Sequence, residues 1–136
     1  MGTRTKRNIY AIDLFCGAGG LTRGLANTGI RVNLGVDIDP DCEFPYTANN
    51  NAKYLLKSVA DVTGSELSPF FRKNGLRLLA GCAPCQTFSS YNRKASDHDQ
   101  RWWLLSEFGR LITETEPHFV TMENVPLLLE HGVFQD

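Results

Sequence analysis

Asp13-Leu-Phe-Cys-Gly17-Ala-Gly19-Gly20 decides the fold, because it lies between the apolar run Ile9-Tyr-Ala-Ile12 and a helix expected over 21–27. A strand that passes through a glycine-rich turn into a helix is typical of a doubly wound α/β sheet. Glycines in such a turn let a ligand approach the backbone, although a plain flexible turn would look the same. The dinucleotide fingerprint requires glycine where this chain has Thr22. The turn therefore does not match the pyrophosphate-binding pattern.

Strand-like and helix-like stretches alternate along the rest of the chain. We expect strands at 32–37, 55–59, 76–80 and 118–122, and helices over 41–50 and 101–115. In the last helix, five apolar residues share one face: Leu104, Leu105, Phe108, Leu111 and Ile112. The alternation predicts an α/β fold with a doubly wound, mostly parallel sheet.

Nearly every predicted strand ends on a group that can take part in chemistry. These groups are Asp13, Asp37, Asp61, the segment 82–86 and Glu123. Ligands bind such sheets beyond the carboxyl ends of the strands, so we expect a site at this edge. Asp37 lies 20 residues beyond Gly17, where a carboxylate can reach both hydroxyls of a ribose. A nucleoside-containing cofactor without a pyrophosphate fits both observations, and a strand-end aspartate without a ligand is the alternative.

Cys82-Ala-Pro-Cys85 allows three interpretations: a redox pair, half of a zinc site, or a single nucleophile. A zinc site needs two more ligands, but the histidines are scattered at 98, 118 and 131, so no metal is expected. We favour Cys85 as a nucleophile on a loop at the binding edge. Cys82 is then expected to be a small buried filler. Cys16 and Cys42 are expected to be packing thiols.

Three further features carry weaker signals. Glu123 ends the fifth strand, where its carboxylate could face Cys85 and exchange a proton with a substrate, although an isolated Glu-Asn pair is more often a cap or a solvated acid. The polar, partly basic segment 88–99 is either a loop that touches phosphates or a plain solvated loop. Trp102 and Trp103 point to different helix faces, and packing is favoured over stacking on a base.

The composition is that of one globular unit. Among 136 residues, 42% are hydrophobic and 21% charged, with 12 glycines and 6 prolines, which excludes disorder and fibrous repeats. No apolar run approaches a membrane span of ~18 residues and no secretory signal opens the chain, so we expect a soluble cytoplasmic protein with reduced cysteines. The net charge of −1 lacks the basic excess of a dedicated nucleic-acid-binding domain.

Taken in order, the motifs resemble those of the cytosine-5 DNA methyltransferases. The matching segments are Asp13 to Gly20, Gly35-Val-Asp37-Ile-Asp39, Asp61-Val62, Ala83-Pro-Cys-Gln-Thr-Phe-Ser89 and Glu123-Asn-Val125. Their combination is specific, whereas no single motif would be. The resemblance implies a Rossmann-like methyltransferase fold, S-adenosylmethionine as methyl donor and double-stranded DNA as substrate, as in restriction-modification. Methylation of tRNA and a non-catalytic, cofactor-binding remnant remain open.

The resemblance also implies roles for individual residues. Cys85 would add to C6 of a flipped-out cytosine, and Glu123 would bind its N3 and exocyclic amine. The implied cofactor residues are Phe15, Gly17, Gly19 and Gly20, with Asp37 on the ribose, Ile38 on the adenine, and Asp61 with Val62 at the adenine edge. The implied substrate loop contains Pro84, Gln86, Ser89 and Asn124, and Arg110 falls in the helix between the two catalytic motifs.

The chain departs from the family pattern at three points. Ala83 replaces a proline, and Asp37 is one methylene shorter than the usual glutamate. The chain also stops 11 residues after Val125. We therefore expect 1–136 to be the amino-terminal part of a catalytic domain, without the Arg-x-Arg motif, the last strands and the target-recognition region. A second chain or a carboxyl-terminal segment would complete it, near the nucleoid in a bacterium, and would cover an otherwise exposed fifth strand.

Overall fold

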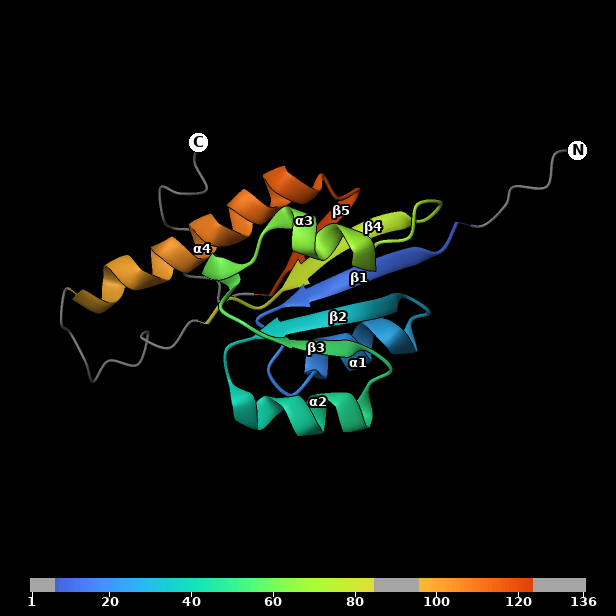
Figure 1. The fold of residues 1–136 in the computed structure, drawn as a ribbon, viewed down its shortest axis with the longest axis horizontal. Coiled ribbons are helices and arrows are strands. Elements are labelled where there is room, and N and C mark those ends of the chain that lie inside the picture. Colours follow the sequence, from blue (N-terminus) through green and yellow to red (C-terminus); the bar gives the residue numbers. More distant parts are fainter. Residues whose placement is uncertain (1–6, 85–95, 124–136) are drawn as a thin grey trace, which may run out of the picture.

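The architecture is a single parallel sheet between helices. The computed structural model describes residues 7–84 and 96–123, with the backbone alone for 96–102. The strands lie in the order β3-β2-β1-β4-β5 (Figure 1) and are β1 (Ile9–Leu14), β2 (Arg31–Asp37), β3 (Lys53–Leu56), β4 (Leu76–Gly81) and β5 (Phe119–Met122). Every pair of neighbouring strands is parallel. The doubly wound parallel sheet predicted from the sequence is confirmed.

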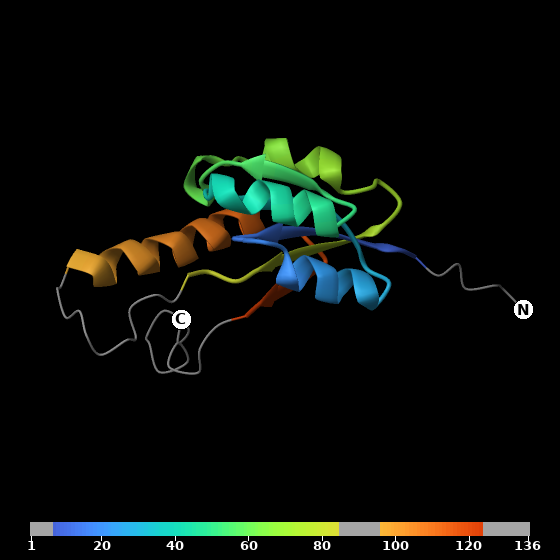
Figure 2. The ribbon, with the colours of Figure 1, turned by 90° about the horizontal axis from the view of Figure 1, so that it is seen from below.

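The helices connect the strands as crossovers. They are α1 (Gly20–Asn27), α2 (Glu43–Asn49), α3 (Gly64–Leu67) and α4 (Ser96–Thr115), joined by 3-10 turns at Pro40–Cys42, Val59–Asp61 and Ser68–Phe70. Figure 2 shows α1 and α3 on opposite faces of the sheet. Among the described helices, none combines the length and apolar character that crossing a membrane requires.

Two apolar clusters hold helices to the sheet. They lie on opposite faces of the sheet, because successive strand residues point to opposite faces. Ile12 and Leu14 of β1 belong to the larger cluster, together with Phe108 and Leu111 of α4. Ala11 faces the other side, where the smaller cluster packs against α1. The apolar face predicted for the last helix is therefore the face that covers the sheet.

Two expected boundaries were wrong. The third strand is β3, Lys53–Leu56, rather than 55–59. The Ser58 side chain accepts a hydrogen bond from the Ala60 N–H and starts the 3-10 turn Val59–Asp61, which ends the extended backbone early. The last helix begins at Ser96 rather than at 101. Both differences lie in polar stretches where apolar periodicity carries no signal.

Candidate functional site

The turn after β1 and the end of β2 meet at the carboxyl edge of the sheet. The Gly17 N–H donates a hydrogen bond of 2.8 Å to Asp37 Oδ2, and the Asp39 N–H donates one of 3.0 Å to Oδ1. Phe15 has a φ of 57°, a left-handed conformation that costs a bulky residue roughly 1–2 kcal/mol. A strained backbone of this kind persists only where the surrounding structure holds it, and such residues are common at functional sites. The structure thus brings together Gly17 and Asp37, the pair that the sequence spacing singled out.

A cavity of about 490 Å³ opens beside this pair. Its lining comes from five parts of the chain and consists of Phe15, Asp37, Ile38, Ser58, Val59, Cys82, Pro84, Trp103 and Leu104. Its size lies in the range of small-molecule sites, roughly 300–1,000 Å³. Ile38 is 71% exposed, so a large apolar side chain stands uncovered next to a carboxylate. An apolar surface beside an acceptor pair suits a nucleoside, whose base is flat and whose ribose donates two hydrogen bonds.

Sequence reasoning missed four of these lining residues: Ser58, Val59, Trp103 and Leu104. Trp103 is half exposed, and the pair of adjacent tryptophans was the available signal for it. Leu104 was expected on the core face of its helix. Cys82 was expected to be a buried filler, but this was wrong, since it is only partly buried and lines the cavity.

Other expected cofactor residues lie outside the cavity lining. Gly19, with a φ of 94°, lies against α2, where a Cβ would collide with Tyr46 and Asn50. Gly20 starts α1 and has room for a Cβ. The side chain of Val62 is fully buried in the core, whereas Asp61 beside it is exposed. Gly19 therefore serves close helix packing, and Val62 offers a ligand only its backbone.

Asp13 is a structural anchor, and the expectation that it ends a strand at the ligand edge was wrong. It lies within β1 and is fully buried. The Thr22 hydroxyl donates a 2.6 Å hydrogen bond to its Oδ2 and lies 3.1 Å from the Tyr46 hydroxyl. Burial, with a smaller contribution from the charge of Asp37, raises the pKa of Asp13 to about 6. The hydroxyl of Thr22 ties α1 and α2 to the sheet at the position where the dinucleotide fingerprint has glycine.

Two of the other thiols are poor nucleophiles. Cys16 is buried, and desolvation strongly raises its pKa. Desolvation followed by the charge of Asp39, whose Oδ2 lies 3.7 Å from the Cys42 Sγ, raises the pKa of Cys42. The thiolate, which is the reactive form, is disfavoured at both positions. The expectation that Cys16 packs in the interior is confirmed by its burial.

The described residues that lead to the expected catalytic segments reach the same edge of the sheet. Cys85, Gln86, Ser89 and Asn124 lie outside the described residues. Pro84, which precedes Cys85, lines the cavity. The Glu123 N–H donates a 3.0 Å hydrogen bond to the Gly81 carbonyl, and the Glu123 side chain is exposed. Glu123 and the chain that leads to Cys85 therefore leave the sheet side by side.

Comparison with known proteins gives one family. The family model described as C-5 cytosine-specific DNA methylase matches residues 9–134. The chain is 50% identical over 115 residues to the type II methylase M.HgiDII of Herpetosiphon aurantiacus, which covers 85% of this chain and 32% of that protein. It is 39% identical over 122 residues to the type II methyltransferase M.XorII of Xanthomonas oryzae, covering 84% of this chain and 27% of that protein.

Among solved structures, a DNA modification methyltransferase encoded within an Escherichia coli prophage superposes with a TM-score of 0.69 at 30% identity. That superposition covers 88% of this chain and 32% of the other. The chain thus spans about a third of the length of the relatives that it matches.

Proposed function

Because this chain belongs to the C-5 cytosine-specific DNA methylase family, we propose that it carries the cofactor site and the nucleophile of a DNA (cytosine-5-)-methyltransferase. One observation supports this above the others. The cavity beside Asp37 is also lined by Pro84, the residue before Cys85. A ligand in the cavity and a base held at Cys85 would therefore be neighbours, as a transfer between them requires.

Several residues have the chemistry to hold S-adenosylmethionine, which when bound supplies an electrophilic methyl group on its sulfonium. Each Asp37 oxygen accepts one backbone N–H and retains a lone pair for a ribose hydroxyl. Ile38 offers an exposed apolar surface to the adenine, with Asp61 and the Val62 backbone at the adenine edge. Phe15 lines the cavity. The glycines of the turn, Gly17, Gly19 and Gly20, are outside this lining, and their role would be to let the cofactor approach the backbone of the turn.

The proposed chemistry uses two side chains. The Cys85 thiolate adds to C6 of a cytosine that has left the DNA stack, while Glu123 holds N3 and the exocyclic amine. This addition would make C5 nucleophilic toward the methyl group that the sulfonium supplies, and the C–S bond that breaks would leave the donor as the neutral thioether S-adenosylhomocysteine. A base then removes the C5 proton, and Cys85 departs as thiolate to restore the ring. Pro84, Gln86, Ser89 and Asn124 would shape the loop around the base.

DNA recognition would lie in a part of the enzyme that this chain does not carry. The chain spans about a third of its relatives, and β5 pairs with β4 alone within the described residues. A carboxyl-terminal segment or a second chain would cover β5 and carry the target-recognition region, and without it we expect no methyl transfer. The activity would serve type II restriction-modification in the cytoplasm of a bacterium.

Mechanism-based trapping tests the proposal. DNA that carries 5-fluorocytosine has no removable C5 proton, so the Cys85 adduct persists and migrates as a covalent protein–DNA complex. The native protein, purified with any chain that accompanies it, should form this complex with S-adenosylmethionine present. Cys85→Ala should form none, and the matched control Cys42→Ala should form as much as the unaltered protein. An adduct that survives in Cys85→Ala would sink the assignment.

Labelled methyl transfer separates the alternatives. Label in DNA alone supports the proposal. Label in tRNA instead would mean that RNA is the substrate, and calorimetric binding of S-adenosylmethionine without any transfer would indicate a non-catalytic cofactor-binding protein. Both results would overturn DNA methylation.

A further inference from the structure

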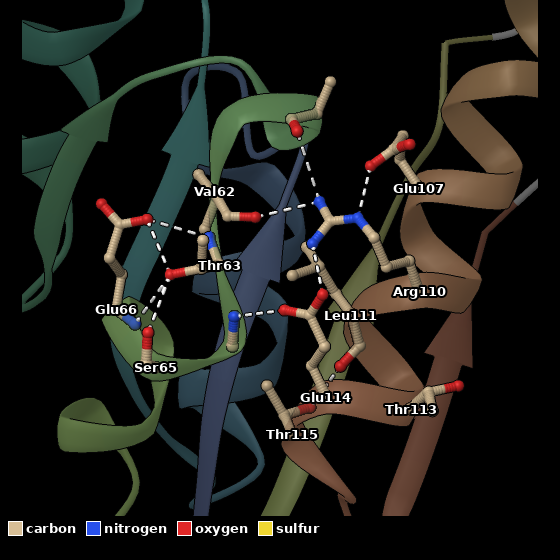
Figure 3. Close-up of polar contacts among 12 residues, drawn as sticks. Val62, Thr63, Ser65, Glu66, Glu107, Arg110, Leu111, Thr113, Glu114 and Thr115 are labelled. Carbon is tan, nitrogen blue, oxygen red and sulfur yellow. Dashed lines mark hydrogen bonds and ion pairs between the residues drawn. The ribbon is translucent and has the colours of Figure 1, made fainter.

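Arg110 of α4 reaches across to the turn that follows β3. Its Nη2 donates hydrogen bonds to the carbonyls of Val62 at 2.9 Å, Val59 at 3.2 Å and Ala60 at 3.4 Å. Figure 3 shows the guanidinium between its helix and this turn. A single side chain thus binds three carbonyls within a stretch of four residues.

Two carboxylates on the same helix fix the guanidinium. Glu107 Oε2 accepts from Nε at 2.6 Å, and Glu114 Oε1 accepts from Nη1 at 2.8 Å. The other oxygen of Glu114 accepts the Gly64 N–H at 2.6 Å. Hydrogen bonds to Glu114 and then Glu107 raise the pKa of Arg110, and the bond to Arg110 lowers that of Glu114. All three nitrogens of Arg110 are occupied, so its orientation is set before any ligand binds.

The turn needs this support because its backbone belongs to no strand. Val59 and Val62 anchor it in the core, and Arg110 binds the carbonyls of both. Between these anchors lies Asp61, whose N–H donates to the Ser58 carbonyl at 3.0 Å and whose side chain is exposed. Ser58 and Val59 also line the cavity. The position of the Asp61 carboxylate relative to the cavity therefore depends on the arginine.

We propose that Arg110 is a positioning residue that holds Asp61 at the adenine edge of the cofactor and thereby sets the selectivity for the 6-amino group. This inference rests on the proposed function. Arginine suits the role because its planar fork serves two carboxylates and a cluster of carbonyls at once, which the single ammonium of lysine cannot.

The experiment compares two ligands in the native protein, purified with any chain that accompanies it. One is S-adenosylhomocysteine, and the other is its purine analogue, which lacks the 6-amino group. The unaltered protein should prefer the adenine compound. Arg110→Met should reduce this preference about tenfold, the equivalent of one hydrogen bond to a charged group, as should Asp61→Ala. Arg110→Lys should restore part of it.

Arg77→Met is the matched control, since Arg77 Nη2 also donates to a backbone carbonyl, that of Glu116 at 2.6 Å, but at the amino edge of the sheet. It should lower the melting temperature and leave the preference unchanged. If Arg110→Met does the same, Arg110 is only structural. If Arg110→Met does not fold, a full preference in the folded Arg110→Lys protein refutes the positioning role. If the unaltered protein binds neither compound, the proposed function itself fails.

Discussion

The carboxylate of Asp37 already receives two backbone N–H groups, from Gly17 and Asp39, and it lines the cavity. Asp37→Ala removes the ribose acceptor as well as both of these bonds. We expect the dissociation constant for S-adenosylhomocysteine to rise about 10- to 100-fold, since hydrogen bonds to a charged group contribute roughly 1.5–3 kcal/mol. Asp37→Glu keeps a carboxylate at this position, so its dissociation constant should stay closer to that of the unaltered protein than the constant of Asp37→Ala does.

Asp41→Ala is the control for this titration, since Asp41 is an exposed acid of the next turn that does not line the cavity. The dissociation constant of Asp41→Ala for S-adenosylhomocysteine should equal that of the unaltered protein. Equal binding by Asp37→Ala and the unaltered protein would remove Asp37 from the cofactor site.

Asp13 makes stability depend on pH. Its folded pKa of about 6 lies above the ordinary value of 3.8, so the fold disfavours the ionised form. The stability that Asp13 contributes is present at low pH, falls as the pH rises from about 4 to 6, and stays lost above that, by about 3 kcal/mol in all. Asp13→Asn stays neutral and still accepts from Thr22, so its advantage over the unaltered protein should grow by about this amount between roughly pH 3.5 and 7.5.

Urea unfolding at several pH values measures this difference. If the free energies of unfolding of the two proteins change in parallel with pH, the pKa of Asp13 does not differ between the folded and unfolded states as expected. The comparison of the two proteins cancels the other carboxylates, including Asp37, which contributes part of the raised pKa.

Single residues show where sequence reasoning reached its limit. The spacing of Gly17 and Asp37 predicted their meeting because parallel strands end at one edge. The same argument misplaced Asp13, since a buried strand aspartate and a strand-end aspartate look alike until the partner hydroxyl of Thr22 is known. The contacts of Arg110 could not be predicted either. Its three partners on the turn are backbone carbonyls, which every residue has, so the sequence does not distinguish them.

Among the elements, β2 and α1 offer a matched pair of glycines. Gly35 in β2 lies under the Tyr46 ring and the Cys16 thiol, which a Cβ would strike, whereas Gly24 in α1 has open space around it. Gly35→Ala should lower the free energy of unfolding by about 1–3 kcal/mol through overpacking. Gly24→Ala should raise it by up to about 1 kcal/mol, because alanine is the better helix former.

Chemical denaturation of both variants checks this pair. A neutral Gly35→Ala would mean that α2 moves away from β2 freely, so that Tyr46 does not hold these elements together. A destabilising Gly24→Ala would mean that the outer face of α1 is covered.

Periodicity predicted the elements with strong apolar patterns and misjudged the ends of the others. The face of α4 that carries Phe108 and Leu111 was legible because those residues pack on the sheet. The end of β3 was not legible, since the strand is stopped by the hydrogen bond that the Ser58 side chain accepts from the Ala60 N–H rather than by a change in apolar alternation. Local polar contacts of this kind decide boundaries, and the hydrophobic pattern does not record them.

For the whole molecule, the parallel order of the strands accounts for the site. Strands β2 and β3 are added to one side of β1, and β4 and β5 are added to the other side. The strand that carries Asp37 and the strand that leads to Cys82 therefore lie on either side of β1. The cavity is lined from both sides of that central strand. Topology could be predicted from the alternation of strands and helices. The cavity lining, however, depends on Trp103 and Leu104 of α4, and the only sequence signal for it was the pair of adjacent tryptophans.

The two edges of the sheet make a final prediction about association. Val120 on β5 is 44% exposed and Leu56 on β3, the opposite edge, is 48% exposed, so the two sites are matched in apolar surface. Phe119 beside Val120 is 49% exposed as well, which makes β5 the more adhesive edge.

We expect the isolated chain to associate with increasing concentration, and Val120→Lys to keep it monomeric, because a charged edge opposes strand pairing. Leu56→Lys should associate as the unaltered chain does. Sedimentation equilibrium measures the association of all three proteins. If Leu56→Lys is monomeric and Val120→Lys still associates, the adhesive edge is β3, and the structural reason for a partner on β5 is removed.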